Sequence, residues 1–157
     1  MKTPSNSLTN TIMAMAAPII RHVLPCMERL SFLPVLGMRL WVARVFWDSG
    51  NAKLSDWEGT LLLFAEEYKV PFISPDFAAY SGTAVELVAP ILITVGFASR
   101  FGAAALLVMT AVIEFTYMHF DIHQVWAMML SLIVLQGPGK ASIDHFIRQY
   151  FKRALAS

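Results

Sequence analysis

The chain has 157 residues, of which 57% are hydrophobic and only 15% are charged, and its formal net charge is +1. Soluble domains average about 45–50% apolar and about 25% charged residues, so this composition, with a mean hydropathy of +0.58, predicts a protein that lies in a lipid bilayer. The small net charge and the lack of a basic stripe with interleaved aromatic residues exclude nucleic-acid binding by bulk charge. With a single cysteine, Cys26, the chain has neither an intramolecular disulfide nor a CxxC redox pair.

Residues 1–31 are expected to form a cytoplasmic or interfacial segment rather than a membrane span. Apolar residues recur at helical spacing between Ile12 and Met27, but Pro18 and Pro25 interrupt the pattern. A sequence broken in this way is typical of an amphipathic segment at the membrane surface.

The first membrane span is predicted over about residues 32–48, and it contains two arginines. Arg44 and Asp48 lie four residues apart, so they are placed to pair along one helix. Arg39 then needs an anion from another helix, or its long side chain reaches out to the lipid headgroups. Both interpretations of Arg39 remain open at this stage.

The loop after this span, which is the first extracytoplasmic loop, has the pattern of a short helix. Ser55 and Glu58 have the spacing of a capping box, with Ser55 as the N-cap. Val70 and Pro71 end the helix, because a residue that precedes proline disfavours the helical conformation. The apolar residues between these limits share one helical face: Trp57, Leu61, Phe64, Ala65 and Tyr68. We expect an amphipathic helix that is too short to span the bilayer and lies on the membrane face.

The second span, about residues 77–97, is almost wholly apolar but carries one carboxylate. Ser74 and Pro75 before it are typical of a helix N-cap and a first helical position. An unpaired charge at the position of Glu86 costs about 3 kcal/mol or more inside a bilayer. The partner that the sequence offers is Arg39 of the first span.

Two further spans and a basic tail complete the chain. The third span, about residues 101–118, begins with small residues that permit close helix approach, and the fourth covers about residues 122–136. Asp121 and Gln124 have the capping spacing that marks the start of the fourth span. Residues 138–157 place apolar residues on one helical face and basic residues elsewhere, which predicts an amphipathic interfacial helix.

Lysines and arginines gather on one side of these spans, in the N-terminal segment, in the connection between the second and third spans and in the tail. The positive-inside rule therefore predicts that both termini are cytoplasmic. The predicted fold is all-α: an integral membrane four-helix bundle over residues 32–137, with interfacial amphipathic helices at both ends and in the first extracytoplasmic loop. Its expected partner is the lipid bilayer that surrounds it. The small residues of the third span would also allow two copies of the chain to pack together as a homo-oligomer.

Several of these residues occur in a recognisable order between Gly37 and Gln136. In chain order they are Arg39, Phe46, Asp48-Ser49-Gly50, Lys53, the Val70-Pro71 break, Glu86 and the closing Gly96-Phe97-Ala98-Ser99-Arg100. This order resembles the DoxX family of small four-helix membrane proteins. The resemblance implies a four-helix bundle in the inner membrane. It also implies a place in redox chemistry, since some members are described as subunits of quinone-linked oxidoreductases, such as thiosulfate:quinone oxidoreductase, or as membrane partners in oxidative-stress complexes.

The strongest candidate site is a buried polar centre made of Glu86, Arg39 and Arg44. A carboxylate inside the membrane, beside arginines, is suited to proton transfer or to hydrogen bonding with a quinone carbonyl. The same charges are equally suited to holding the first two helices in register. Function and architecture both remain open for this set.

A second candidate set surrounds the turn between the third and fourth spans: Glu114, Tyr117, His119, Asp121, His123 and Trp126. Four of these residues are expected to form the opening that a quinone approaches: Glu114, Tyr117, His119 and Trp126. A transition-metal site of His119, Asp121 and His123 is the alternative, although H-x-D-x-H is not a specific metal signature. A polar turn that faces water is the third interpretation.

No cofactor motif accompanies these residues, because the sequence has no GxGxxG, no CxxCH and no cysteine set for an iron–sulfur cluster. Any electron carrier must therefore come from a protein partner or be a diffusing quinone. We predict the membrane subunit or anchor of a quinone-linked redox system. The alternative is a non-enzymatic membrane scaffold, or a permeation component for small solutes or metal ions.

Overall fold

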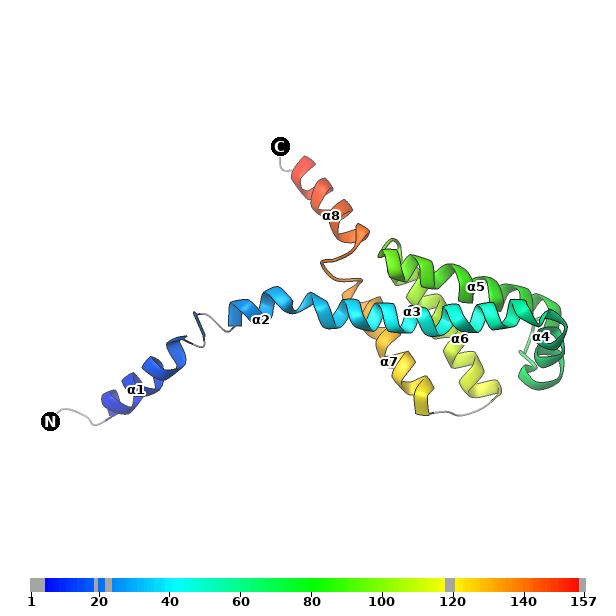
Figure 1. The fold of residues 1–157 in the computed structure, drawn as a ribbon, viewed down its shortest axis with the longest axis horizontal. Helices are drawn as coiled ribbons and strands as arrows, with labels where there is room; N and C mark the ends of the chain where they lie inside the picture. Colours follow the sequence, from blue (N-terminus) through cyan, green and yellow to red (C-terminus); the bar gives the residue numbers. More distant parts are fainter. Residues whose placement is uncertain (1–4, 19, 22–23, 118–120, 156–157) are drawn as a thin grey trace. The chain divides into compact units, whose positions relative to one another are not determined.

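The computed structural model describes residues 5–18, 20–21, 24–117 and 121–155. The chain divides into two compact units, Met1–Pro34 and Val35–Ser157, and each is described by itself. The first unit contains α1 (Ser5–Pro18) and α2 (Leu24–Leu30), drawn in shades of blue in Figure 1.

The second unit is built on four helices that share one hydrophobic core. They are α3 (Phe32–Ser55), α5 (Pro75–Val95), α6 (Ser99–Thr116) and α7 (Asp121–Gln136). All four contribute to the core: Val42, Ala43 and Phe46 from α3, Ala89 and Ile93 from α5, Ala103 and Leu106 from α6, and Leu130 and Ile133 from α7. The prediction of an all-α four-helix bundle is confirmed.

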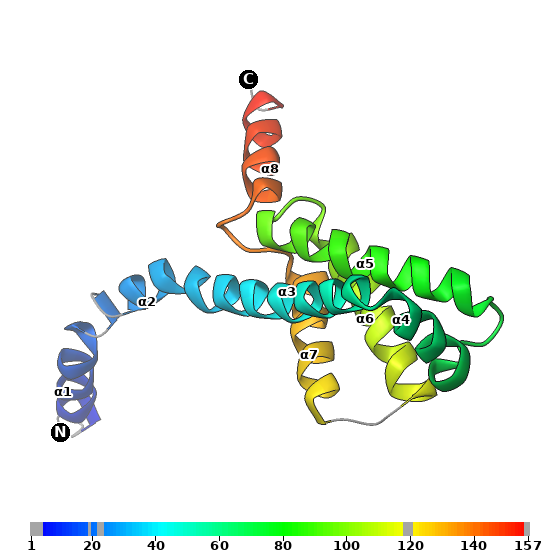
Figure 2. The same ribbon diagram turned by 45° about the vertical axis from the view of Figure 1, so that its right-hand side comes forward.

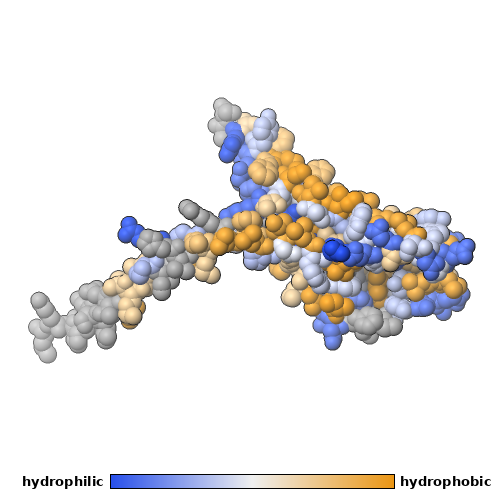
Figure 3. Space-filling view, in the orientation of Figure 1, coloured by the Kyte–Doolittle hydropathy of each residue, from blue (hydrophilic) through white to orange (hydrophobic). Residues whose placement is uncertain are grey.

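Three helices among the described residues are long and apolar enough to cross a membrane: Leu24–Ser55, Pro75–Val95 and Ser99–Thr116. The first of these starts earlier and ends later than the predicted span. The fourth helix of the core, α7, has 16 residues and is shorter than the other three. Figure 3 shows hydrophobic residues over the bundle and hydrophilic residues gathered toward the end where α4 lies.

The start of the helix after α3 differs from the prediction. Ser55, expected to be an N-cap, is the last residue of α3, and its hydroxyl donates to the carbonyl of Ala52 at 2.7 Å. The carboxylate of Asp56 instead accepts from the backbone N–H of Gly59 at 3.0 Å and caps α4 (Trp57–Leu63). A Cβ at position 59 would collide with this carboxylate, which would have to shift to make room for it.

The amphipathic helix after α3 buries its apolar face within the bundle. α4 continues into a π-helical turn, η2 (Phe64–Tyr68). Phe64 packs against Ala78 and Ala79 in the first turns of α5, with partly buried residues of α4 and η2 around them. The aromatic side chains of this helix thus find an apolar partner in α5, and its place on the membrane face stays a prediction.

The ends of α5 match the sequence signals. The hydroxyl of Ser74 accepts from the backbone N–H of Phe77 at 3.3 Å, and Pro75 takes the first helical position. Gly96 ends the helix in the left-handed conformation, with φ of +77°, where a residue with a side chain would be strained.

The tail forms α8 (Ile143–Ala154), whose first turn is capped by the hydroxyl of Ser142. In both Figure 1 and Figure 2 this helix leaves the bundle across the direction of α5. The predicted amphipathic tail helix is confirmed, while its place at the membrane interface stays a prediction.

Candidate functional site

Glu86 lies at the centre of a small network of buried polar side chains. The carboxylate Oε2 is 2.6 Å from Nζ of Lys53, and Oε1 accepts from the hydroxyl of Ser49 at 3.2 Å. Lys53 also donates to the Ser49 hydroxyl at 2.9 Å, so the three groups close a triangle. The side chain of Glu86 is 2% exposed and that of Lys53 is 11% exposed. Ser49 and Lys53 lie one helical turn apart on α3, on the face that meets α5.

Arg39 does not pair with Glu86, and that prediction was wrong. The guanidinium is 1% exposed and donates only to main-chain carbonyls among the described residues. These acceptors, with donor–acceptor distances, are Ile93 at 3.0 Å, Thr94 at 2.9 Å, Pro138 at 2.6 Å and Ala141 at 2.8 Å. Two of the carbonyls end α5, where the helix dipole favours a cation, and the other two belong to the connection between α7 and α8.

The reason for this error is the register of α3 against α5. A Cβ at Gly50 would lie 3.1 Å from Cβ of Glu86, so Glu86 faces the C-terminal half of α3. Arg39 lies eleven residues before Gly50, which is about 16 Å along a helix. No ion pair between Arg39 and Glu86 can form at that separation.

Arg44 is not part of a buried polar centre either. Its Nε lies 3.2 Å from Oδ2 of Asp48, as the four-residue spacing predicts. The two side chains are 79% and 60% exposed, so this ion pair lies on the outer surface of α3. The pairing is confirmed, and the buried location of Arg44 is contradicted.

Lys53 is the functional candidate that the sequence analysis placed in a loop. The predicted first span ended at Asp48, whereas α3 continues to Ser55 and carries Lys53 into the bundle. The signal in the sequence was weak: Ser49 and Lys53 lie at helical spacing, but Gly50 and Asn51 between them are poor helix formers.

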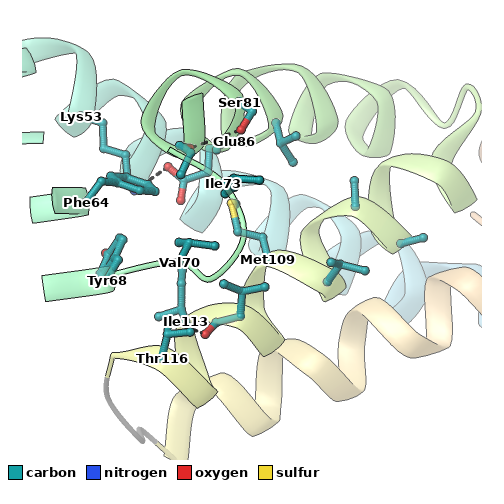
Figure 4. A pocket seen from close by; sticks show the side chains of 17 residues that line it. Lys53, Phe64, Tyr68, Val70, Ile73, Ser81, Glu86, Met109, Ile113 and Thr116 are labelled. Carbon is teal, nitrogen blue, oxygen red and sulfur yellow. Dashed lines mark hydrogen bonds and ion pairs between the residues drawn. The ribbon is translucent and has the colours of Figure 1, made fainter. Parts of the chain in front are cut away.

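The Lys53–Glu86 pair borders a cavity of about 470 Å³ between η2, α5 and α6. Figure 4 shows the carboxylate at one wall, with Phe64 and Tyr68 on one side and Met109 and Ile113 on another. The remaining walls are apolar as well, apart from Ser81 and Thr116. The cavity is therefore a hydrophobic pocket with one ion pair in its wall.

Small residues leave the space for this cavity. A Cβ at Gly82 would lie 3.3 Å from the ring of Phe64, and Ala104 and Ala105 line the α6 side. Val108, another lining residue, is 64% exposed, so the cavity reaches the outer surface of α6. We expect this opening to face the acyl chains when the protein lies in a bilayer.

A second hollow, of about 500 Å³, also borders Lys53, and polar or charged residues make up more of its lining than of the first cavity. Ser49 and Lys53 border it together with three carboxylates: Asp56, Glu66 and Glu67. Lys53 therefore stands between an apolar pocket and an acidic hollow.

The structure brings together part of the second predicted set. Nδ1 of His123 on α7 lies 2.7 Å from Oε2 of Glu114 on α6. The ring of Trp126 packs on His123 at 5.1 Å between centroids and on Phe46 at 5.4 Å. Glu114, His123 and Trp126 thus form one cluster between α6 and α7, separate from the Lys53–Glu86 cavity.

The other members of that set are placed differently. Asp121 is exposed and begins α7, and His119 lies outside the described residues. Across residues 24–117 and 121–155, no group of three or more metal-ligating side chains gathers. The metal site of His119, Asp121 and His123 therefore stays a prediction.

Tyr117 contacts the Lys53–Glu86 cavity indirectly, through Tyr68. The two rings pack edge to face at 4.8 Å between centroids. A hydrogen bond to Glu67 raises the pKa of Tyr117. Tyr117 therefore links α6 to η2 at the end of the cavity that Tyr68 lines.

We expect Tyr68 to lower the stability of the fold at alkaline pH. Burial and, after it, the charge of Glu86 raise the pKa of Tyr68 to about 12. In the unfolded chain the phenol ionises near about pH 10, so between these values the unfolded state binds fewer protons and stability falls as pH rises. Thermal unfolding at about pH 9 and about pH 11 should show a smaller loss of Tm in Tyr68→Phe than in the wild type. Equal losses of Tm in both proteins would show that folding does not raise the pKa of the Tyr68 phenol.

The chain matches a known protein family over most of the bundle. Residues 35–119 match the DoxX family, a region that makes up more than half of the chain and contains both Lys53 and Glu86. The chain belongs to the DoxX family. No curated protein and no solved structure matches it. The DoxX region covers most of α3 and all of α4, η2, α5 and α6, and it therefore contains every residue that lines the cavity.

Proposed function

We propose that this DoxX family protein is the membrane subunit of a quinone-linked redox system and binds the quinone in the Lys53–Glu86 cavity. The observation that carries this proposal is the buried ion pair in the wall of an otherwise apolar cavity. Ligand pockets typically have about 300–1,000 Å³ and apolar walls with a few polar groups that orient the ligand, and this cavity fits that description.

The lining of the cavity fits the two parts of a lipid quinone. The Nζ of Lys53 is a donor suited to a ring carbonyl, and the aromatic rings of Phe64 and Tyr68 offer flat apolar contact. The long tail of such a molecule exceeds the cavity, and the opening beside Val108 gives it a way into the acyl region. These features support a membrane-dissolved ligand over a water-soluble one.

The polar network also supports proton exchange at this site. A bound quinone supplies reversible two-electron, two-proton chemistry. Glu86 and Lys53, 2.6 Å apart, can hold or pass a proton, and the acidic hollow beyond Lys53 connects the pair with polar surroundings. The electrons come from a protein partner, since the sequence carries no cofactor motif of its own.

Filling the cavity should remove the quinone. Ala104→Phe places a ring in the cavity, and a cost of about 1–3 kcal/mol for overpacking corresponds to roughly a 5-fold to 150-fold loss of binding. Ala84→Phe is the matched control, because Ala84 lies exposed on α5 and does not line the cavity. The measurement is the quinone content of each protein, purified in mild detergent and extracted for mass spectrometry.

The comparison has a clear opposing outcome. If wild type, Ala84→Phe and Ala104→Phe all lack quinone and none binds added decylubiquinone, the quinone proposal fails. The cavity would then belong to a membrane scaffold without a redox ligand.

A further inference from the structure

The helix α8 is joined firmly to the start of α6. Oδ1 of Asp144 accepts from the backbone N–H of Ala98 at 3.0 Å, and Oδ2 accepts from that of Ser99 at 3.3 Å. The backbone N–H of Asp144 donates to the carbonyl of Gly96 at 2.9 Å. The first turn of α8 therefore supplies the cap of α6, and this contact sets the direction in which α8 leaves the bundle.

A groove of about 310 Å³ lies beside this junction, between α6 and α8. Two arginines line it from opposite elements, Arg100 from α6 and Arg148 from α8. Within residues 24–117 and 121–155 neither arginine forms an ion pair, and Arg100 makes only one long contact, 3.4 Å to the carbonyl of Leu135. The carboxylate in the groove, Asp144, already uses both oxygens on the N-terminus of α6. The groove therefore offers two guanidinium groups to an external anion.

Apolar side chains lie beside these two cations in the groove and further along α8. Phe101, which lines the groove, is 80% exposed. On α8, Phe146, Tyr150 and Phe151 are each more than half exposed. An anion that binds here therefore meets Phe101 and Ile147 in the groove, while the aromatic residues of α8 extend the exposed apolar surface along the helix.

The charges of this end of the bundle match an anionic membrane surface. α8 carries Lys152 and Arg153 in its last turn, and Lys140 precedes it. The carboxylates of the acidic hollow lie with α4 and η2, at the other end of α3 and α5. A basic end with an exposed amphipathic helix is the arrangement expected beside anionic headgroups.

We propose that the groove between Arg100 and Arg148 binds the phosphate of an anionic membrane lipid. The planar guanidinium groups donate paired hydrogen bonds to phosphate oxygens, a geometry that a lysine does not reproduce. The acyl chains lie against Phe101, and α8 rests along the membrane surface with its aromatic face in the lipid. The neighbouring apolar side chains favour a lipid, because its acyl chains can contact them and a free phosphate ion cannot.

The test measures lipid binding to the full-length protein in detergent. Phosphatidylglycerol, phosphatidylcholine and inorganic phosphate are added separately, and bound lipid is counted by native mass spectrometry while Tm is recorded. We expect phosphatidylglycerol to bind and to raise Tm in the wild type. Arg100→Gln/Arg148→Gln should weaken that binding about tenfold or more, the loss expected for charge-assisted hydrogen bonds.

Two controls separate this site from general charge. Arg44→Gln removes an arginine of the exposed Arg44–Asp48 pair and should bind phosphatidylglycerol as the wild type does. Arg100→Lys/Arg148→Lys keeps both charges without the planar fork and should fall between wild type and the glutamine variant. Circular dichroism without lipid establishes that each variant is folded.

Three outcomes would overturn the proposal. The first is equal binding of phosphatidylcholine and phosphatidylglycerol by the wild type. The second is an equal rise of Tm with inorganic phosphate, which would make the ligand a free anion. The third is full phosphatidylglycerol binding by a folded Arg100→Gln/Arg148→Gln protein. None of these results depends on whether the Lys53–Glu86 cavity holds quinone.

Discussion

Replacing Arg39 by methionine is expected to lower the free energy of unfolding by about 4 kcal/mol, because each buried acceptor left without a donor costs about 1–3 kcal/mol and a change this large is rare for one substitution. The guanidinium is 1% exposed and donates to four main-chain carbonyls. Two of these carbonyls lie at the end of α5 and two lie between α7 and α8, so Arg39 ties three parts of the bundle together. The measurement is unfolding of the detergent-solubilised protein followed by circular dichroism.

Two further variants make this expectation specific. Arg44→Met removes an exposed arginine of the same helix and should change stability by no more than about 0.5 kcal/mol. Arg39→Lys keeps the charge but has only three N–H donors on one nitrogen, so it should fall between Arg39→Met and the wild type. If Arg39→Met and Arg44→Met lowered the free energy of unfolding by the same amount, Arg39 would not be the buried link between these parts of the bundle.

Helix ends with strong local chemistry could be predicted from sequence. Ser74 and Pro75 start α5, and Gly96 ends it, because capping and a left-handed residue depend on neighbours in the chain. The end of the first span could not be found in this way. Asp48 suggested an end, yet α3 continues to Ser55, where tertiary contacts of Lys53 with α5 stabilise the last turns.

The candidate site could be predicted only in part. Glu86 stands out because a single carboxylate in an apolar run needs a partner. Which cation supplies that partner depends on the register of α3 against α5, and register is a property of packing between helices. The sequence suggested Arg39 as the partner of Glu86, whereas the observed register places Lys53 beside it.

The cavity was missed because it is made by side chains that are small. The run from Gly102 to Ala105 predicted close helix approach, and this holds for Gly102, where a Cβ would lie 3.2 Å from the carbonyl of Ala89. Ala104 and Ala105, which follow on the same helix, instead line the Lys53–Glu86 cavity, as Gly82 does. Small residues therefore allow close helix packing on one face of α6 and leave the cavity unfilled on another face.

Removing Lys53 alone should destabilise the protein strongly, by about 3–5 kcal/mol, because Lys53→Met leaves the carboxylate of Glu86 buried without its cation. Glu86→Met should also be destabilising, since it leaves the ammonium group without its anion. The double variant Lys53→Met/Glu86→Met replaces the pair by apolar side chains of similar length and should recover most of the loss. Unfolding of the four proteins in detergent gives the coupling between the two positions.

The double variant also separates architecture from ligand binding. If the ion pair serves the quinone, Lys53→Met/Glu86→Met should be nearly as stable as the wild type and still lose most of its bound quinone. If the pair only holds α3 and α5 in register, the double variant should keep its quinone, and the polar contact to the ligand must lie elsewhere. The comparison works because a buried ion pair exchanged for methionines keeps the packing while it removes every donor and acceptor that the pair presents to the cavity.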